Sequence, residues 1–279
     1  MKQALKFLSL TSLCTTLLFA NINDENIIEF EKKRVSQNPN VEVLDVSVSF
    51  KKEMPLKNWY GYILDVQAEV KASKDSTKVI SVKDIVFSNG KYVSLDLQDI
   101  KTGKSLKSLV TPTLSDNYYK KEKLIAGNHN AKNKVVIFSD PLCPFCMDYV
   151  PDVINYVNKN NSNIALYYYH FPLLRIHPAA GPLSKIMEVA KHKNIKDLEL
   201  KVYSIDWDKY FDSKSTNINK ILEAFNKELK TNITLEQLRK ANIQKDINMG
   251  ENVMVQGTPT IFVNGIKDTT REKYKTLGK

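Results

Sequence analysis

Hydrophobic and polar residues alternate along residues 60–71: every even position is apolar or aromatic, and most odd positions are polar or charged. This period of two is typical of a β-strand that has one face on a core and the other in water. Residues 41–50 alternate in the same way. Their phase slips at Leu44 and Asp45, where a β-bulge would restore the facing of the strand.

Other signals place a helix and a hairpin beside these strands. Apolar residues within the charged segment 27–35 predict an amphipathic helix, and Asn38-Pro39-Asn40 would end it. Asn89-Gly90 lies between two apolar segments and predicts a tight hairpin turn, because both residues tolerate positive φ. We therefore expect residues 21–112 to form one domain, in which a curved antiparallel sheet packs against a helix.

The second half of the chain mixes strand and helix patterns. A buried strand is expected at 134–138, followed by a helix and a second strand. Apolar residues spaced three and four apart then predict helices, and a last strand is expected at 260–263. We interpret residues 128–279 as an α+β domain whose order of elements resembles a thioredoxin-like fold with a helical insertion at about 179–252. The Lys-rich segment 113–127 is expected to be a linker helix.

The charge pattern narrows the range of partners. The chain carries a net charge of +10, and its lysines are spread over nearly every segment. No arginine-aromatic cluster or nucleic-acid-binding motif accompanies them. The charge therefore indicates a solvated basic surface, and we expect no nucleic-acid partner.

Residues 1–20 have the features of a secretory signal peptide. Lys2 and Lys6 precede a mostly apolar run, and Ala20 supplies the small residue that a signal peptidase requires. An uncleaved membrane anchor is the alternative, but the run is short and contains several Ser and Thr residues. Cys14 suggests lipid attachment, yet a bulky leucine precedes it. We expect cleavage and a location in the oxidising periplasm.

After this segment the chain has two cysteines, in the sequence Cys143-Pro144-Phe145-Cys146 directly after the strand at 134–138. A disulfide across four residues closes too little chain to stabilise a fold, so the pair is expected to do chemistry. At a strand-to-helix turn, backbone amides and the helix dipole would stabilise a Cys143 thiolate. We expect Cys143 to attack disulfides and Cys146, one turn further in, to release the mixed disulfide. The dipeptide Pro144-Phe145 is expected to tune the redox potential.

A second candidate segment, Gly257-Thr258-Pro259, precedes the last predicted strand. In the thioredoxin fold that the chain resembles, the corresponding proline is cis. A cis Pro259 would expose the Thr258 backbone for pairing with a substrate chain. An ordinary trans bond at the start of a strand is the alternative.

Half of a zinc site is another interpretation of the cysteine pair. Tetrahedral zinc needs two more ligands, and only histidines could supply them. None of the histidines shows paired ligand spacing, so we expect no metal; they are His129, His170, His177 and His192. Asp140 is expected to cap the turn before the helix, with assistance to proton transfer near Cys146 as the alternative.

The segment from Phe138 to Cys146, together with Gly257 to Thr260, resembles the active site of the periplasmic DsbC/DsbG group of dimeric disulfide isomerases. The Pro-Phe dipeptide is closest to the DsbG type, and a weaker match covers residues 87–103. The resemblance implies a cystatin-like N-terminal dimerisation domain over 21–112, a homodimer, and a cleft for unfolded or misoxidised exported proteins. It implies no cofactor.

Three functions follow from these patterns. The leading one is a dimeric isomerase or reductase of protein disulfides, kept reduced by a membrane partner of the DsbD type. The second is a disulfide oxidase of the DsbA type, reoxidised by a partner of the DsbB type, which the long helical insertion favours. The third is a holdase chaperone whose redox activity is secondary.

Overall fold

The computed structural model describes residues 24–73, 76–193 and 195–278. The chain divides into two compact units, the first ending at Val110 and the second beginning at Thr111. The predicted signal segment, residues 1–20, lies outside the described residues. Within the described part of the chain, no helix is both long enough and apolar enough to span a membrane.

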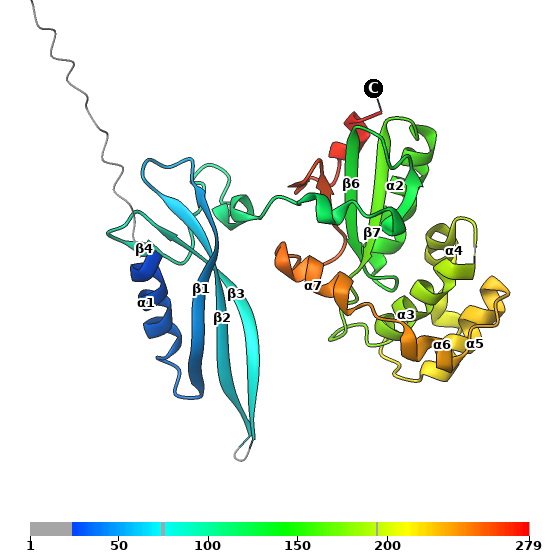
Figure 1. The fold of residues 1–279 in the computed structure, drawn as a ribbon, viewed down its shortest axis with the longest axis horizontal. Coiled ribbons are helices and arrows are strands. Elements are labelled where there is room, and N and C mark those ends of the chain that lie inside the picture. Colours follow the sequence, from blue (N-terminus) through cyan, green and yellow to red (C-terminus); the bar gives the residue numbers. More distant parts are fainter. Residues whose placement is uncertain (1–23, 74–75, 194, 279) are drawn as a thin grey trace, which may run out of the picture. The chain divides into compact units, whose positions relative to one another are not determined.

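Among its described residues, the first unit contains one α-helix and a four-stranded antiparallel sheet in the order β1-β2-β3-β4 (Figure 1). Helix α1 lies along the sheet. The elements are α1 (Asp24–Val35), β1 (Val41–Glu53), β2 (Tyr60–Ser73), β3 (Ser76–Ser88) and β4 (Val93–Ser94), followed by a 3-10 helix, η1 (Leu106–Val110).

The alternating pattern of residues 60–71 corresponds to β2. Tyr62, Leu64 and Val66, at its even positions, are buried in one cluster with Ile27 of α1. The predicted bulge is confirmed, because the register of β1 against β2 shifts between Val43 and Asp45. A second shift, near Phe50, has no signal in the sequence. A hairpin forms at the predicted place, but not with the predicted two-residue turn. Ser88 pairs with Val93, so the loop runs from Asn89 to Tyr92, and of Asn89 and Gly90 only Gly90 has a positive φ, 85°.

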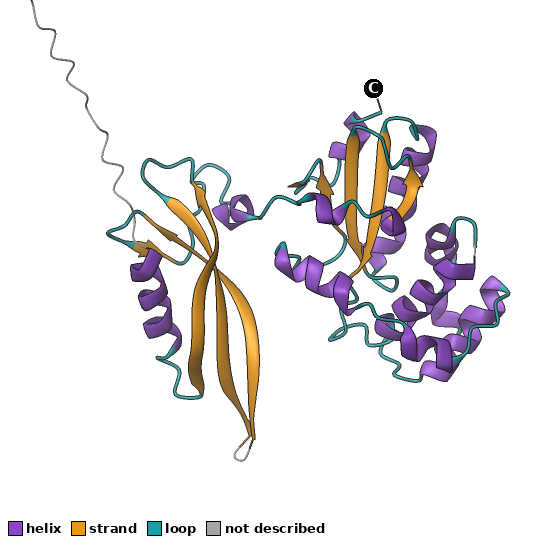
Figure 2. Ribbon diagram, viewed as in Figure 1, coloured by secondary structure: helices purple, strands orange, loops and turns teal. Residues whose placement is uncertain are grey.

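The second unit is built on a five-stranded sheet in the order β5-β7-β6-β8-β9, shown in orange in Figure 2. Strands β6 and β7 are parallel and are connected through helix α2, whereas the other pairs are antiparallel. The elements are β5 (Leu124–Gly127), β6 (Asn133–Ser139), α2 (Pro144–Lys159), β7 (Ile164–His170), β8 (Thr260–Val263), β9 (Ile266–Lys267) and a closing 3-10 helix, η6 (Lys273–Thr276).

Both faces of this sheet are buried. Ile137 and Tyr168 point to the face that packs against α2 and the helical insertion. Phe138 and Tyr169 point to the opposite face, where they pack against Tyr118 from the segment before β5. Neighbouring residues of one strand therefore belong to different layers.

The segment 113–127, expected to be a linker helix, forms two 3-10 turns, η2 (Asp116–Tyr118) and η3 (Lys121–Lys123), and then strand β5. It is part of the second unit. The Tyr118 side chain is buried and donates to the Met249 carbonyl, and β5 completes the sheet by pairing with β7. Lys120 and Lys121 are exposed on these turns, a charge pattern that an exposed helix would share.

The helical insertion between β7 and β8 is confirmed, and helices α3 to α6 form one group in Figure 1. The buried Trp207 stacks with Phe211 and Phe225, at ring-centroid distances of 5.6 and 6.2 Å. The helices are α3 (Ala180–Ala190), α4 (Leu198–Ser204), α5 (Ile218–Leu229), α6 (Leu235–Lys240) and α7 (Gln244–Asn252).

Candidate active site

The two cysteines lie where β6 passes into α2. Cys143 is the residue that precedes the first helical turn, and Pro144 begins the helix, where its missing N–H leaves no bond unmade. Both sulfurs are free thiols. Cys143 is 4% exposed and Cys146 is fully buried, whereas Phe145 between them is 70% exposed. The cysteine nearer the surface is the one expected to attack.

The Thr258–Pro259 peptide bond is cis, as predicted. Strand β8, which follows it, pairs with β6, and this pairing brings Thr258 to the end of the sheet where α2 begins. The Cys143 thiol donates to the Thr258 carbonyl, with 3.5 Å between sulfur and oxygen. The two segments that the sequence singled out are therefore in contact.

The surroundings of Cys143 favour its thiolate. A hydrogen bond from the Cys146 thiol is the largest influence and lowers the pKa of Cys143 to about 6, against partial burial. Hydrogen bonding from the Thr258 side chain and from the Cys146 backbone amide lowers this pKa further. The Asp140 carboxylate opposes them weakly. These donors are those expected of a nucleophilic sulfur at the start of a helix.

Cys146 has the opposite character. Burial raises the pKa of its thiol far above the ordinary value, and the hydrogen bond that it gives to Cys143 raises it further. Cys146 therefore keeps its proton while Cys143 is ionised, and that proton is what stabilises the Cys143 sulfur.

Asp140 caps the turn before α2, as predicted. One of its carboxylate oxygens accepts from the Leu142 amide at 2.7 Å. The other accepts from the Leu173 amide at 2.8 Å and lies 3.0 Å from Nδ1 of His177. This buried carboxylate ties the active-site turn to the segment after β7. The contact with His177 has no signal in the sequence.

A second group that the sequence does not reveal is a row of buried hydroxyls beneath Cys146. The Ser139 hydroxyl, at the end of β6, lies 2.6 Å from the Tyr203 hydroxyl on α4. The Tyr203 hydroxyl lies 2.9 Å from that of Tyr168 on β7. Ser139 also acts on Cys146: hydrogen bonding from its side chain lowers the pKa of this thiol, against the larger effect of burial.

A cavity of about 490 Å³ opens beside the exposed Phe145 ring. It is lined by residues 256–261, which include the cis-proline loop, and by residues 267–269 and Arg271. Lys267 and Arg271 bring positive charge to this lining, and Asp268 brings negative charge. The cavity therefore places apolar and charged surface next to the Thr258 backbone.

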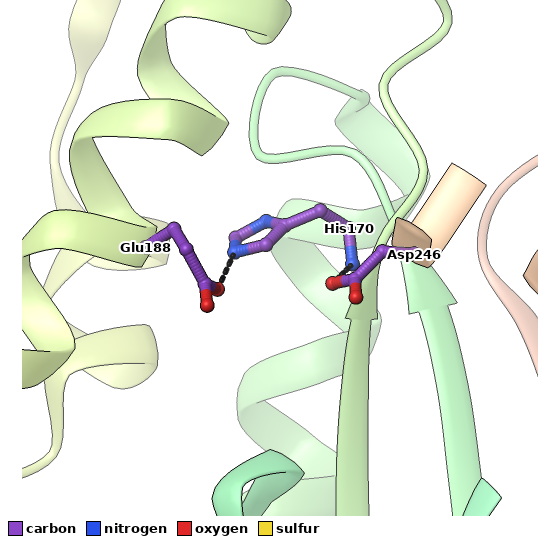
Figure 3. A group of neighbouring side chains, drawn as sticks. All are labelled: His170, Glu188 and Asp246. Atoms are coloured by element: carbon purple, nitrogen blue, oxygen red, sulfur yellow. Dashed lines mark hydrogen bonds and ion pairs between the residues drawn. The ribbon is translucent and has the colours of Figure 1, made fainter. Parts of the chain in front are cut away.

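One group of described residues has side chains that could hold a metal ion: His170, Glu188 and Asp246. Figure 3 shows the His170 ring pointing to Glu188 and the Asp246 carboxylate at the His170 backbone amide. Lys123 already donates to Asp246 at 2.8 Å and to Glu188 at 3.4 Å, and Lys191 lies 3.1 Å from Glu188. Two ammonium groups thus occupy the place of a cation, and we interpret the cluster as an ion-pair network.

Comparisons with known proteins agree with this architecture. The thioredoxin family profile matches residues 119–279. The chain belongs to the thioredoxin family. No curated protein matches the chain at a significant level.

Solved structures with a similar chain trace include three bacterial proteins. DsbA2 of Pseudomonas aeruginosa is 18% identical, with 53% of this chain and 84% of that chain covered and a TM-score of 0.39. ScsC of Proteus mirabilis, in a transitional conformation, is 19% identical, with coverage of 65% and 79% and a TM-score of 0.42. Oxidised BdbD of Bacillus subtilis is 17% identical, with coverage of 59% and 91% and a TM-score of 0.40. The family assignment rests on the profile match.

Proposed function

We propose that this member of the thioredoxin family is a periplasmic thiol-disulfide oxidoreductase that isomerises or reduces non-native disulfides of exported proteins. The observation that carries the proposal is the asymmetry of the cysteine pair. Cys143 is held as a thiolate beside the Thr258 backbone, and Cys146 is held as a buried thiol one helical turn away.

The chemistry proceeds in two exchanges. The Cys143 thiolate attacks one sulfur of a substrate disulfide, so that a mixed disulfide forms and the other substrate sulfur leaves as a thiolate. Either another substrate thiolate attacks the substrate sulfur of the mixed disulfide, so that a different substrate disulfide forms and Cys143 leaves as a thiolate, or Cys146 attacks the Cys143 sulfur. The first route isomerises the substrate. The second route breaks the mixed disulfide, forms the Cys143–Cys146 disulfide and leaves the substrate reduced.

The remaining parts of the proposal concern assembly and partners. The first unit, with one helix against an antiparallel sheet, has the composition of elements expected of a cystatin-like dimerisation domain. A homodimer formed through it would present two Cys143 sites to one unfolded chain. A membrane reductant of the DsbD type would return the pair to the dithiol state after each reduction.

A disulfide oxidase of the DsbA type, reoxidised by a partner of the DsbB type, is the second candidate, and the helical insertion from α3 to α7 favours it. Trapping the thiols in cells by rapid alkylation separates the two functions. A largely reduced Cys143–Cys146 pair supports the isomerase or reductase, and a largely oxidised pair supports the oxidase. A Cys143→Ala variant that still suppressed aggregation would support a holdase chaperone.

Substitution of the cysteines tests the proposed roles in vitro. Cys143→Ser should abolish insulin reduction and the reactivation of scrambled ribonuclease, because it removes the attacking sulfur. Cys146→Ser should instead accumulate mixed disulfides, visible on non-reducing gels, because attack proceeds without release. Mixed disulfides in the Cys143→Ser protein and none in the Cys146→Ser protein would contradict the assignment.

A further inference from the structure

Cys146 has to act as a nucleophile in surroundings that oppose its ionisation. Its side chain is fully buried, and burial raises the pKa of the thiol. Once Cys143 is bonded to a substrate sulfur, it no longer accepts the proton of Cys146. The developing anion on Cys146 then needs hydrogen-bond donors that are already in place, because water does not reach it.

The hydroxyls beneath Cys146 supply such donors. Ser139 Oγ, Tyr203 Oη and Tyr168 Oη are linked by contacts of 2.6 and 2.9 Å. All three residues are buried, and Tyr168, Tyr203 and Cys146 belong to one cluster. Each hydroxyl has a single proton. When Ser139 donates to sulfur, Tyr203 must donate to Ser139 and Tyr168 must donate to Tyr203, so the row has one direction.

We propose that Tyr168, Tyr203 and Ser139 form a chain of hydrogen-bond donors that ends on the Cys146 sulfur and stabilises its anion during release of the mixed disulfide. Ser139 is the member of the row that acts on the Cys146 thiol, whose pKa it lowers. Tyr203 and Tyr168 are positioning residues, which act by polarising the Ser139 hydroxyl. The inference rests on the proposed function and adds three residues to its second exchange.

The step balances without a further reactant. A bond forms between the sulfurs of Cys146 and Cys143, and the bond between Cys143 and the substrate sulfur breaks. The substrate sulfur leaves with the electron pair and takes up the proton that Cys146 loses. The hydroxyl chain keeps its own protons throughout, because burial holds the pKa of both Tyr168 and Tyr203 well above the ordinary value.

Other ionisable groups face this region. Asp140 and Cys143 lie on the active-site turn, and Glu199 of α4 acts on Tyr168. The pKa of Glu199 is raised by burial. His170 packs edge-on against the Tyr168 ring, 5.0 Å between centroids, and burial lowers its pKa, so it is neutral. None of these groups lies within hydrogen-bonding contact of the Tyr168 hydroxyl.

The two exchanges can be timed separately on the full-length protein. The reduced protein is mixed with a symmetrical aromatic disulfide whose thiolate is coloured. Attack by Cys143 releases the first thiolate at a rate that depends on reagent concentration, and attack by Cys146 releases the second at a rate that does not. The second rate, followed against pH, reports the ionisation of Cys146.

Loss of any hydroxyl of the Tyr168–Tyr203–Ser139 row should slow the release of the second thiolate and leave the release of the first unchanged. We expect Ser139→Ala to slow it about tenfold, as for one hydrogen bond to a charged group, and Tyr203→Phe and Tyr168→Phe roughly threefold to fivefold. The rate of the first release should stay within about twofold of the wild-type rate. In each variant the pH midpoint of the second release should rise, because the anion has lost stabilisation.

Tyr169→Phe is the matched control. Tyr169 is the neighbour of Tyr168 on the same strand, and its buried hydroxyl donates to the Tyr118 carbonyl at 3.0 Å on the other face of the sheet. It should leave both releases unchanged. Equal slowing of both releases, or equal effects of Tyr169→Phe and Tyr203→Phe, would overturn the inference. Failure of the wild-type protein to release any coloured thiolate would instead contradict the proposed function on which it rests.

Discussion

Cys143 and Cys146 are the same side chain in two environments. The first receives hydrogen bonds at the start of a helix, and the second is fully buried in the core, next to the row of hydroxyls that begins at Ser139. The proton that burial keeps on Cys146 is the one that stabilises the Cys143 thiolate. The reactivity of the pair therefore comes from the difference in burial and hydrogen bonding between two thiols one helical turn apart.

The lowered pKa of Cys143 gives a testable pH dependence. Only the thiolate is alkylated, so the rate of iodoacetamide modification should reach half its maximum near pH 6 and fall to roughly a tenth of the maximum at pH 5. Folding lowers this pKa from about 8.5 in the unfolded chain. The ionisation therefore stabilises the reduced fold fully above that value, and the contribution is lost as the pH falls through 6.

Cys146→Ala is the companion measurement. It removes the largest influence on Cys143, so the alkylation midpoint should move to higher pH. A wild-type midpoint near that of an unstructured cysteine peptide, with no change in the variant, would show that the fold does not activate Cys143.

The active-site residues that the sequence predicts are those with a local signal. Cys143 and Cys146 are recognisable from their spacing, and Thr258-Pro259 is recognisable from its place before a predicted strand. Ser139 and Tyr203 meet only because α4 of the insertion folds back against the end of β6. Contacts of that kind depend on packing between distant elements and leave no pattern along the chain.

The place of strand β5 beside β7 depends on the backbone conformation of one residue, Gly127. Gly127 ends β5 with φ of 79°, and a Cβ atom there would lie 2.0 Å from the Ile164 carbonyl oxygen. An L side chain is strained in this conformation, and the contact is with backbone that cannot rotate away. The pairing of β5 with β7 therefore requires glycine at this position.

Gly127→Ala should destabilise the second unit by more than about 2 kcal/mol, measured by denaturant unfolding of the reduced protein. Gly257→Ala is the control, because Gly257 has no positive φ, and a methyl group added there would meet no atom of the described residues within 4 Å. Gly257→Ala should leave the free energy of unfolding nearly unchanged. Similar losses in both variants would mean that β5 tolerates a side chain.

The spacing of hydrophobic residues and the residue types typical of turns predicted most of the helices and strands, including the β1 bulge and the hairpin at Asn89-Gly90. The prediction for segment 113–127 was wrong because its decisive contacts are with partners far along the chain: Tyr118 with Met249, and Leu124 with Tyr167. Exposed lysines distinguish solvent from core, but they do not distinguish a helix from a turn.

The division of the chain at Val110 and Thr111 places the start of the second unit before the segment expected as a linker. Leu114 and Tyr118 are buried in the cluster on one face of the sheet, and β5 forms its edge. The second unit therefore includes residues 111–127, which the sequence patterns placed in the first domain and in a linker.

Two truncations test this boundary. Residues 111–279 alone should fold, show a single cooperative thermal transition and retain a Cys143 alkylation midpoint near pH 6. Residues 128–279 should aggregate or melt at much lower temperature, because the edge of β7 and the apolar cluster that includes Phe138 and Tyr169 lose their cover. Equal stability of the two fragments would contradict the boundary.

The stacked Trp207 of the insertion has one counterpart in the chain, Trp59, and the two indoles fall in different units. Tryptophan fluorescence of the full-length protein is consequently the sum of one contribution from each unit. Replacing either indole with phenylalanine would leave a single optical probe on one unit. Melting of each half could then be followed within the intact polypeptide, without labels and without cutting it.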